Sequence, residues 1–134
     1  MTVHHIAMHC INLREQERFY REQLGFRRAR VFKAGTPNEF FMLRLGNVCI
    51  ELFPTPGKPS RADKAGQSVG FTHLAFEVQD IEGKVSELRA AGVEMGNIVD
   101  CSDTVPGLRI CFFKDPDGNV IELMEGWQDE EAVQ

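Results

Sequence analysis

The pattern of apolar and polar positions along the chain occurs twice. The repeat is visible in three pairs of aligned segments: VHHIAMHCINL at 3–13 with FTHLAFEVQDI at 71–81, LGF at 24–26 with AGV at 91–93, and IEL at 50–52 with IEL at 121–123. The spacing between copies drifts by a few residues, as loop insertions between equivalent units would cause. The sequence therefore predicts two modules of similar length, about 1–66 and 67–134.

Each module is predicted to contain a strand, a helix and three further strands. The predicted strands are residues 4–11, 26–33, 40–45 and 48–53 in the first module, and 71–78, 96–101, 109–114 and 120–125 in the second. Asn12 and Asp80 are typical N-cap residues, and Gly25 and Gly92 are suited to ending the helices that follow them. The Pro- and Gly-rich stretch 54–66 is the expected linker. Each module therefore has the order βαβββ.

Composition and charge narrow the class of protein. The chain has 134 residues, of which 43% are hydrophobic and 26% charged, and its net charge is −5. These values are typical of a soluble globular protein and argue against a nucleic-acid partner, which would require clustered Lys and Arg. No apolar stretch is long enough to span a membrane. Four isolated cysteines and the lack of a secretory signal favour a cytoplasmic protein with reduced thiols.

The repeat places a histidine and a glutamate at equivalent positions in both modules. His5 and His73 lie in the first strands, and Glu51 and Glu122 lie in the last strands. Because side chains alternate across a strand, both glutamates point away from their apolar neighbours. Two imidazoles and two carboxylates suit a divalent ion such as Zn²⁺, Ni²⁺, Co²⁺, Mn²⁺ or Fe²⁺. An octahedral ion would keep two positions for water or substrate oxygens.

A structural role for these residues is the alternative. A single His–Glu pair in a sheet is usually an ion pair rather than a set of metal ligands. Its recurrence in both modules favours the ligand interpretation, although duplication would also preserve a structural pair in each half. Three further side chains are candidates for lining the site: His9, which shares the face of His5, Glu77, which shares the face of His73, and Arg109, which could hold an anionic substrate.

With these residues in view, the chain resembles the vicinal oxygen chelate superfamily, which includes glyoxalase I, methylmalonyl-CoA epimerase, fosfomycin-resistance enzymes and extradiol dioxygenases. The segments that carry the resemblance are HHIA at 4–7, FY at 19–20 with LGF at 24–26, IELF at 50–53, HLAF at 73–76 and DPDGNVIEL at 115–123. The resemblance covers nearly the whole chain. It implies one α+β domain over residues 1–134, in which two tandem βαβββ modules form an incomplete barrel around one metal ion.

Within that superfamily, His5, Glu51, His73 and Glu122 match the pattern of the bacterial glyoxalase I enzymes that prefer nickel or cobalt; zinc or manganese are further possibilities. The resemblance implies that an α-oxoaldehyde–thiol hemithioacetal is converted through an enediolate to a 2-hydroxyacyl thioester. Glu122 is the expected base and Glu51 the carboxylate facing it, with glutathione or another thiol as co-substrate. A homodimer is also implied.

Two other functions remain open at this point. The first is epimerisation of a 2-methyl acyl-CoA, which uses the same enolate chemistry, although the epimerases usually carry glutamine in place of Glu51. The second is non-catalytic binding of a drug or metabolite. A ring-cleaving dioxygenase is disfavoured, because four protein ligands leave less room around the iron.

Overall fold

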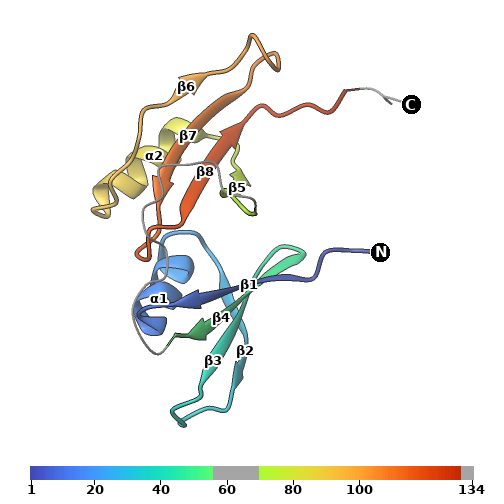
Figure 1. Cartoon of the computed structure of the whole chain (residues 1–134). Coiled ribbons are helices and arrows are strands. Elements are labelled where there is room, and N and C mark those ends of the chain that lie inside the picture. Colours follow the sequence, from blue (N-terminus) through green and yellow to red (C-terminus); the bar gives the residue numbers. More distant parts are fainter. Residues whose placement is uncertain (56–69, 131–134) are drawn as a thin grey trace. The chain divides into compact units, whose positions relative to one another are not determined.

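The chain divides into two compact units, Met1–Val69 and Gly70–Gln134 (Figure 1). The computed structural model describes residues 1–55 and 70–130. Most of the predicted linker at 54–66 lies outside the described residues. Each unit is an open four-stranded sheet with one helix, so the predicted α+β class with two βαβββ modules is confirmed.

The first unit contains one helix and a four-stranded sheet. Its elements are β1 (His5–Cys10), α1 (Leu13–Glu22), β2 (Arg27–Phe32), β3 (Phe40–Leu45) and β4 (Val48–Pro54). The strand order is β1-β4-β3-β2, in which β1 runs parallel to β4 and the other pairs are antiparallel. The parallel pair is possible because α1 supplies the crossover connection between β1 and the rest of the sheet.

The second unit repeats this topology. Its elements are β5 (Leu74–Glu77), α2 (Ile81–Ala90), β6 (Val99–Asp100), β7 (Arg109–Lys114) and β8 (Val120–Glu125). The strand order is β5-β8-β7-β6, again with the first and last strands of the module parallel and adjacent. In both units, therefore, the strand expected to carry the glutamate lies beside the strand or segment that carries the histidine.

The helices begin where the sequence predicts. The Asn12 side chain accepts a hydrogen bond from the Glu15 backbone N–H (3.1 Å), and the Asp80 side chain accepts one from the Gly83 N–H (3.0 Å). Each bond satisfies a backbone donor that has no partner within the helix. Neither ten-residue helix in the described part of the chain is long and apolar enough to cross a membrane.

The core of each unit lies between the helix and one face of the sheet. In the first unit the fully buried side chains include Tyr20 of α1, Leu43 of β3 and Ile50 and Leu52 of β4. The second unit has an equivalent core of Ile81, Val85, Leu88, Ile121 and Leu123. Because alternate residues point to opposite faces, Glu51 and Glu122 lie on the sheet faces away from these cores.

Two predicted strands are shorter than expected. The predicted strand 71–78 is Leu74–Glu77, because Leu74 pairs with Ile121 and β8 begins only one residue before that. The predicted strand 96–101 is Val99–Asp100. Val99 lies four positions after Met95, whereas their partners Ile110 and Phe113 are three positions apart, so an extra residue interrupts the ladder. The other predicted strands agree within one residue.

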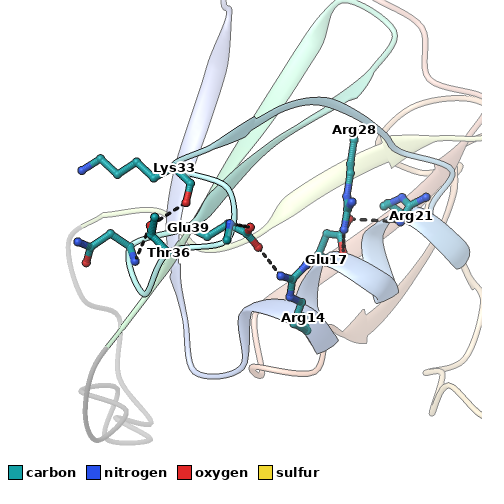
Figure 2. A network of polar contacts seen from close by, with 9 residues as sticks. Arg14, Glu17, Arg21, Arg28, Lys33, Thr36 and Glu39 are labelled. Atoms are coloured by element: carbon teal, nitrogen blue, oxygen red, sulfur yellow. Dashed lines mark hydrogen bonds and ion pairs between the residues drawn. The ribbon is translucent and has the colours of Figure 1, made fainter.

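A cluster of charged residues joins α1 to the sheet of the first unit, and the sequence analysis did not predict it. Glu17 of α1 has a side chain that is only 5% exposed, and Figure 2 shows Arg21 and Arg28 directed at it. Arg28 Nη2 donates to Glu17 Oε2 (3.1 Å), and Arg28 Nε donates to Glu17 Oε1. Burial raises the pKa of Glu17, but the hydrogen bond and charge of Arg28, with help from Arg21, outweigh burial and lower the pKa overall.

Candidate functional site

The first predicted pair, His5 and Glu51, is brought together by the parallel pairing of β1 with β4. Ala7 is the partner of Glu51 in the ladder, and His5 lies two residues before Ala7 on the same face. His5 Nε2 is 4.0 Å from Glu51 Oε1. The His5 side chain is 41% exposed and that of Glu51 16% exposed, so both remain accessible to a small ligand.

The second pair, His73 and Glu122, has the same arrangement in the second unit. Ala75 is the partner of Glu122, and His73 lies two residues before Ala75. His73 Nε2 is 2.8 Å from Glu122 Oε2, and the two side chains are 36% and 14% exposed. Both pairs thus present an imidazole Nε2 and a carboxylate oxygen from equivalent register positions.

The other ring nitrogen of each histidine contacts the residue immediately before it. His5 Nδ1 is 2.9 Å from His4 Nδ1, and His73 Nδ1 is 2.8 Å from Thr72 Oγ1. With the proton on Nδ1, each imidazole donates to that neighbour and keeps the Nε2 lone pair available for a metal ion. Histidine ligands commonly have such a partner, which sets the tautomer and the ring orientation. The sequence analysis assigned no role to His4 or Thr72.

These donors fit a divalent ion. Two carboxylates balance a charge of +2, and borderline ions accept imidazole nitrogen together with carboxylate oxygen. Each unit contributes one imidazole and one carboxylate, and no group of three or more His, Cys, Asp or Glu side chains gathers at one place within residues 1–55 and 70–130.

The face that carries His5 and Glu51 has further features. His9 and Ala7 of β1 and Phe53 of β4 line a partly open pocket, together with Met8 of β1. Ala7, which has a small side chain, is the ladder partner of Glu51. His9 was expected to share the face of His5, and it does.

Arg109, by contrast, is engaged in structural contacts. Its guanidinium donates to Glu125 Oε2 from Nη2 (2.9 Å) and Nε (3.1 Å), and to Glu82 Oε1 from Nη1 (3.1 Å). These bonds raise the pKa of Arg109, and the pKa of Glu125 is lowered by the bond from the Ile81 N–H and then by Arg109. Arg109 thus links β7 to β8 and α2, which does not favour the role in substrate binding considered for it from the sequence.

Comparison with known proteins places these features in a family context. The sequence model of the Glyoxalase/Bleomycin resistance protein/Dioxygenase superfamily matches residues 2–123. An uncharacterized protein of Bacillus subtilis (strain 168), YwkD, is 34% identical over 129 residues, which cover 92% of this chain and 96% of that protein.

Two solved structures illustrate how far the similarity extends. A glyoxalase family protein from Enterococcus faecalis has a TM-score of 0.78 and 32% identity, covering 92% of this chain and 97% of that one. A lactoylglutathione lyase from Agrobacterium tumefaciens has a TM-score of 0.67 but only 19% identity, with 93% of each chain covered. At that identity the likeness to the lyase shows a shared fold and not a shared reaction.

Proposed function

The chain belongs to the Glyoxalase/Bleomycin resistance protein/Dioxygenase superfamily, and from that premise we propose that it is a divalent-metal-dependent enzyme of the glyoxalase I type. Its substrate would be the hemithioacetal of an α-oxoaldehyde and a thiol, and its product a 2-hydroxyacyl thioester. Members of this superfamily include enzymes and drug-resistance proteins alike, so the activity has to be argued from the site.

The observation that supports this proposal most is the duplicated His–Glu pair. In both units the imidazole Nε2 and the carboxylate oxygen lie on the sheet face away from the core, at the same register positions. Duplication alone would also preserve a structural pair, but in both units the histidine Nδ1 contacts the preceding residue while Nε2 faces the carboxylate, as in metal-binding histidines. We assign His5, Glu51, His73 and Glu122 as the metal ligands, with nickel or cobalt favoured over zinc or manganese.

The proposed reaction moves protons between neighbouring atoms of the substrate. When bound, a divalent ion supplies Lewis acidity, which makes the C–H bond beside a coordinated carbonyl easier to break. Glu122 takes the proton from the sulfur-bearing carbon and returns it to the neighbouring carbon, while the hydroxyl proton moves to the former carbonyl oxygen. No atom is gained or lost. Glu51 provides the second carboxylate and balances the positive charge of the site.

The remaining features of the proposal concern the co-substrate and the assembly. The thiol would be glutathione or another low-molecular-weight thiol, which the activity assay should therefore vary. We further propose that the protein acts as a cytoplasmic homodimer. A dimer would allow the two His–Glu pairs of one site to come from one chain or from two.

The proposal is tested by measuring metal content and turnover on the same protein. The full chain, reconstituted with nickel, cobalt, zinc or manganese, is expected to bind one ion per site and to isomerise methylglyoxal hemithioacetals. Glu122→Gln should lower kcat by at least about a hundredfold, because the base contributes roughly that much. Glu87→Gln removes an exposed carboxylate of α2 from the same unit and should leave turnover unchanged.

Other outcomes would contradict this assignment. Wild-type turnover in Glu122→Gln would exclude that residue as the base. Turnover of an acyl-CoA without any glyoxalase activity would favour the epimerase function instead. Ligand binding without turnover and without dependence on metal would indicate a binding protein of the same fold.

A further inference from the structure

Three arginines share the sheet face that carries His5 and Glu51. The strand register shows this directly, because Arg44 of β3 is the partner of Cys49 on β4 and of Arg27 on β2. Met42 is the partner of both Glu51 and Arg30. Since ladder partners point to the same side of a sheet, Arg27, Arg30 and Arg44 lie on the face of Glu51 and not on the face covered by α1.

These arginines differ from Arg28 on the opposite face of the sheet and from the arginines of α1, which covers that face. There, Arg14 pairs with Glu39, and Arg21 and Arg28 pair with Glu17 (Figure 2). For Arg27, Arg30 and Arg44, by contrast, no ion pair forms with any carboxylate among residues 1–55 and 70–130; the Arg30 guanidinium lies over the Phe32 ring, 5.9 Å from its centroid. Arg27 and Arg44 are moreover direct ladder partners, an arrangement of like charges that destabilises a sheet unless an anion lies near them.

An aromatic row runs across the same face beside the arginines. The rings of Phe32 and Phe40 are stacked with centroids 4.5 Å apart, and those of Phe40 and Phe53 with centroids 4.7 Å apart. The His9 ring continues the row, 6.0 Å from Phe53. The three phenylalanines are half-buried, so their outer edges remain available to the apolar part of a ligand.

We propose that this face binds the oxyanion of the substrate, a carboxylate or a phosphate, through Arg30 and Arg44 with Arg27 beside them, and that the aromatic row contacts the apolar part of the same molecule. The inference rests on the proposed function, since it takes the face of His5 and Glu51 as the substrate site. A guanidinium holds such oxyanions by paired N–H bonds.

The dimensions of the sheet fit a small molecule. Neighbouring strands are about 4.8 Å apart, and β3 lies between β2 and β4. The backbones at Arg30 on β2 and Glu51 on β4 are therefore about 10 Å apart across the strands. An arginine side chain is long enough to shorten that distance by several ångströms. A substrate whose reacting oxygens lie near Glu51 would therefore reach the arginines with an anionic group a few bonds away.

The test uses binding of a simple probe, independent of catalysis. Phenylphosphonate, which combines a ring with an oxyanion, is titrated calorimetrically into the full chain in the presence of EDTA. The wild type should bind it, and Arg30→Gln and Arg44→Gln should each weaken binding at least fivefold. Arg18→Gln removes an exposed arginine of α1, away from this face, and should change the affinity less than twofold. Methylphosphonate, which lacks the ring, should bind more weakly than phenylphosphonate.

Several results would overturn the inference. One is equal affinity of the wild type, Arg30→Gln, Arg44→Gln and Arg18→Gln, and another is the absence of binding by the wild type. If Arg30→Gln changed the oligomeric state but left the affinity for phenylphosphonate unaltered, the arginines would bind another protein chain instead. Because the titration needs no metal, failure here leaves the metal-content and turnover assays of the proposed function unaffected, and failure of those assays leaves this titration interpretable.

Discussion

At the residue scale, the contact between Thr72 and His73 leads to the first prediction. Thr72 Oγ1 is 2.8 Å from His73 Nδ1, and valine has nearly the same shape without the hydroxyl. Thr72→Val should therefore leave the fold intact and lower the affinity for a divalent ion about tenfold, because the imidazole loses the partner that orients it. Metal titration of the full chain measures this effect. Thr104→Val, at an exposed position of the same unit, serves as the control, and equal affinities in both variants would exclude a positioning role.

Residues on strands were easier to predict than residues just outside them. Glu51 and Glu122 could be assigned to the face away from the core because strict alternation along β4 and β8 determines where each side chain points. His4 and Thr72 precede β1 and β5, where no alternation applies, and their contacts depend on rotamers that the sequence does not reveal. Arg27, Arg30 and Arg44 were missed because their shared face depends on the pairing of β2 with β3, which includes an irregularity between Arg28 and Arg30.

At the scale of elements, the ion pair between α1 and β2 leads to the second prediction. Glu17 is nearly buried and accepts hydrogen bonds from Arg28, whose side chain is 39% exposed. Glu17→Gln keeps the shape but loses the charge, and it should lower the free energy of unfolding by about 1–3 kcal/mol. Urea denaturation at neutral pH measures the loss. Glu22→Gln, at the exposed end of the same helix, should change stability by less than about 0.5 kcal/mol.

The same pair predicts how stability depends on pH. Because the pKa of Glu17 is lowered on folding, the folded state binds its proton less readily than the unfolded state. The stabilisation is therefore complete above the ordinary pKa of 4.5 and is lost as the pH falls through the lower folded-state value. The difference between wild type and Glu17→Gln should accordingly shrink in acid. A difference that stays constant down to pH 3 would contradict this account.

The turn between β7 and β8 gives the third prediction. The Asp115 side chain is buried and accepts hydrogen bonds from the backbone N–H of Asp117 (3.0 Å), and from both the backbone N–H (2.9 Å) and the side-chain amide (2.8 Å) of Asn119. Asp115→Ala leaves these donors without their acceptor and should cost about 2–3 kcal/mol of stability. Thermal or urea unfolding measures the cost. Asp103→Ala, in the exposed connection before β7, is the matched control, and an equal effect of both changes would refute the role of this turn.

Elements with strong local signals were predicted well, and those that depend on distant partners were not. The caps at Asn12 and Asp80 and the strands at 109–114 and 120–125 are encoded by adjacent residues. The short β6 depends on the interrupted pairing with β7, which cannot be recognised in residues 96–101 alone. The burial of Gln16 and Glu17 on α1 was also unforeseen, because polar residues are normally exposed and Glu17 is neutralised by an arginine of another element.

At the scale of the whole molecule, the duplication made the fold predictable from sequence. Two copies of one pattern predicted two units with the same topology, and both units have it. The duplication also predicted the two His–Glu pairs, each of which the structure brings together within its own sheet. The convergence of all four residues on one ion is a separate hypothesis, because it depends on contacts between modules that a repeat in the sequence does not specify.

That hypothesis leads to the last prediction, in which removing either pair abolishes metal binding by the whole molecule. A single imidazole and carboxylate provide too few ligands to hold a borderline divalent ion tightly. Nickel at a hundred times its dissociation constant should stabilise the wild type by about 2.7 kcal/mol. The double variants His5→Ala/Glu51→Ala and His73→Ala/Glu122→Ala should each lose that stabilisation completely, as thermal unfolding with and without nickel would show. If either double variant kept half of the bound metal, the two pairs would be independent sites. Mixing the two double variants then tells whether a site lies within one chain or is shared between two. If sites are shared, a mixed dimer regains one site with all four ligands; if each site lies within one chain, no site is regained.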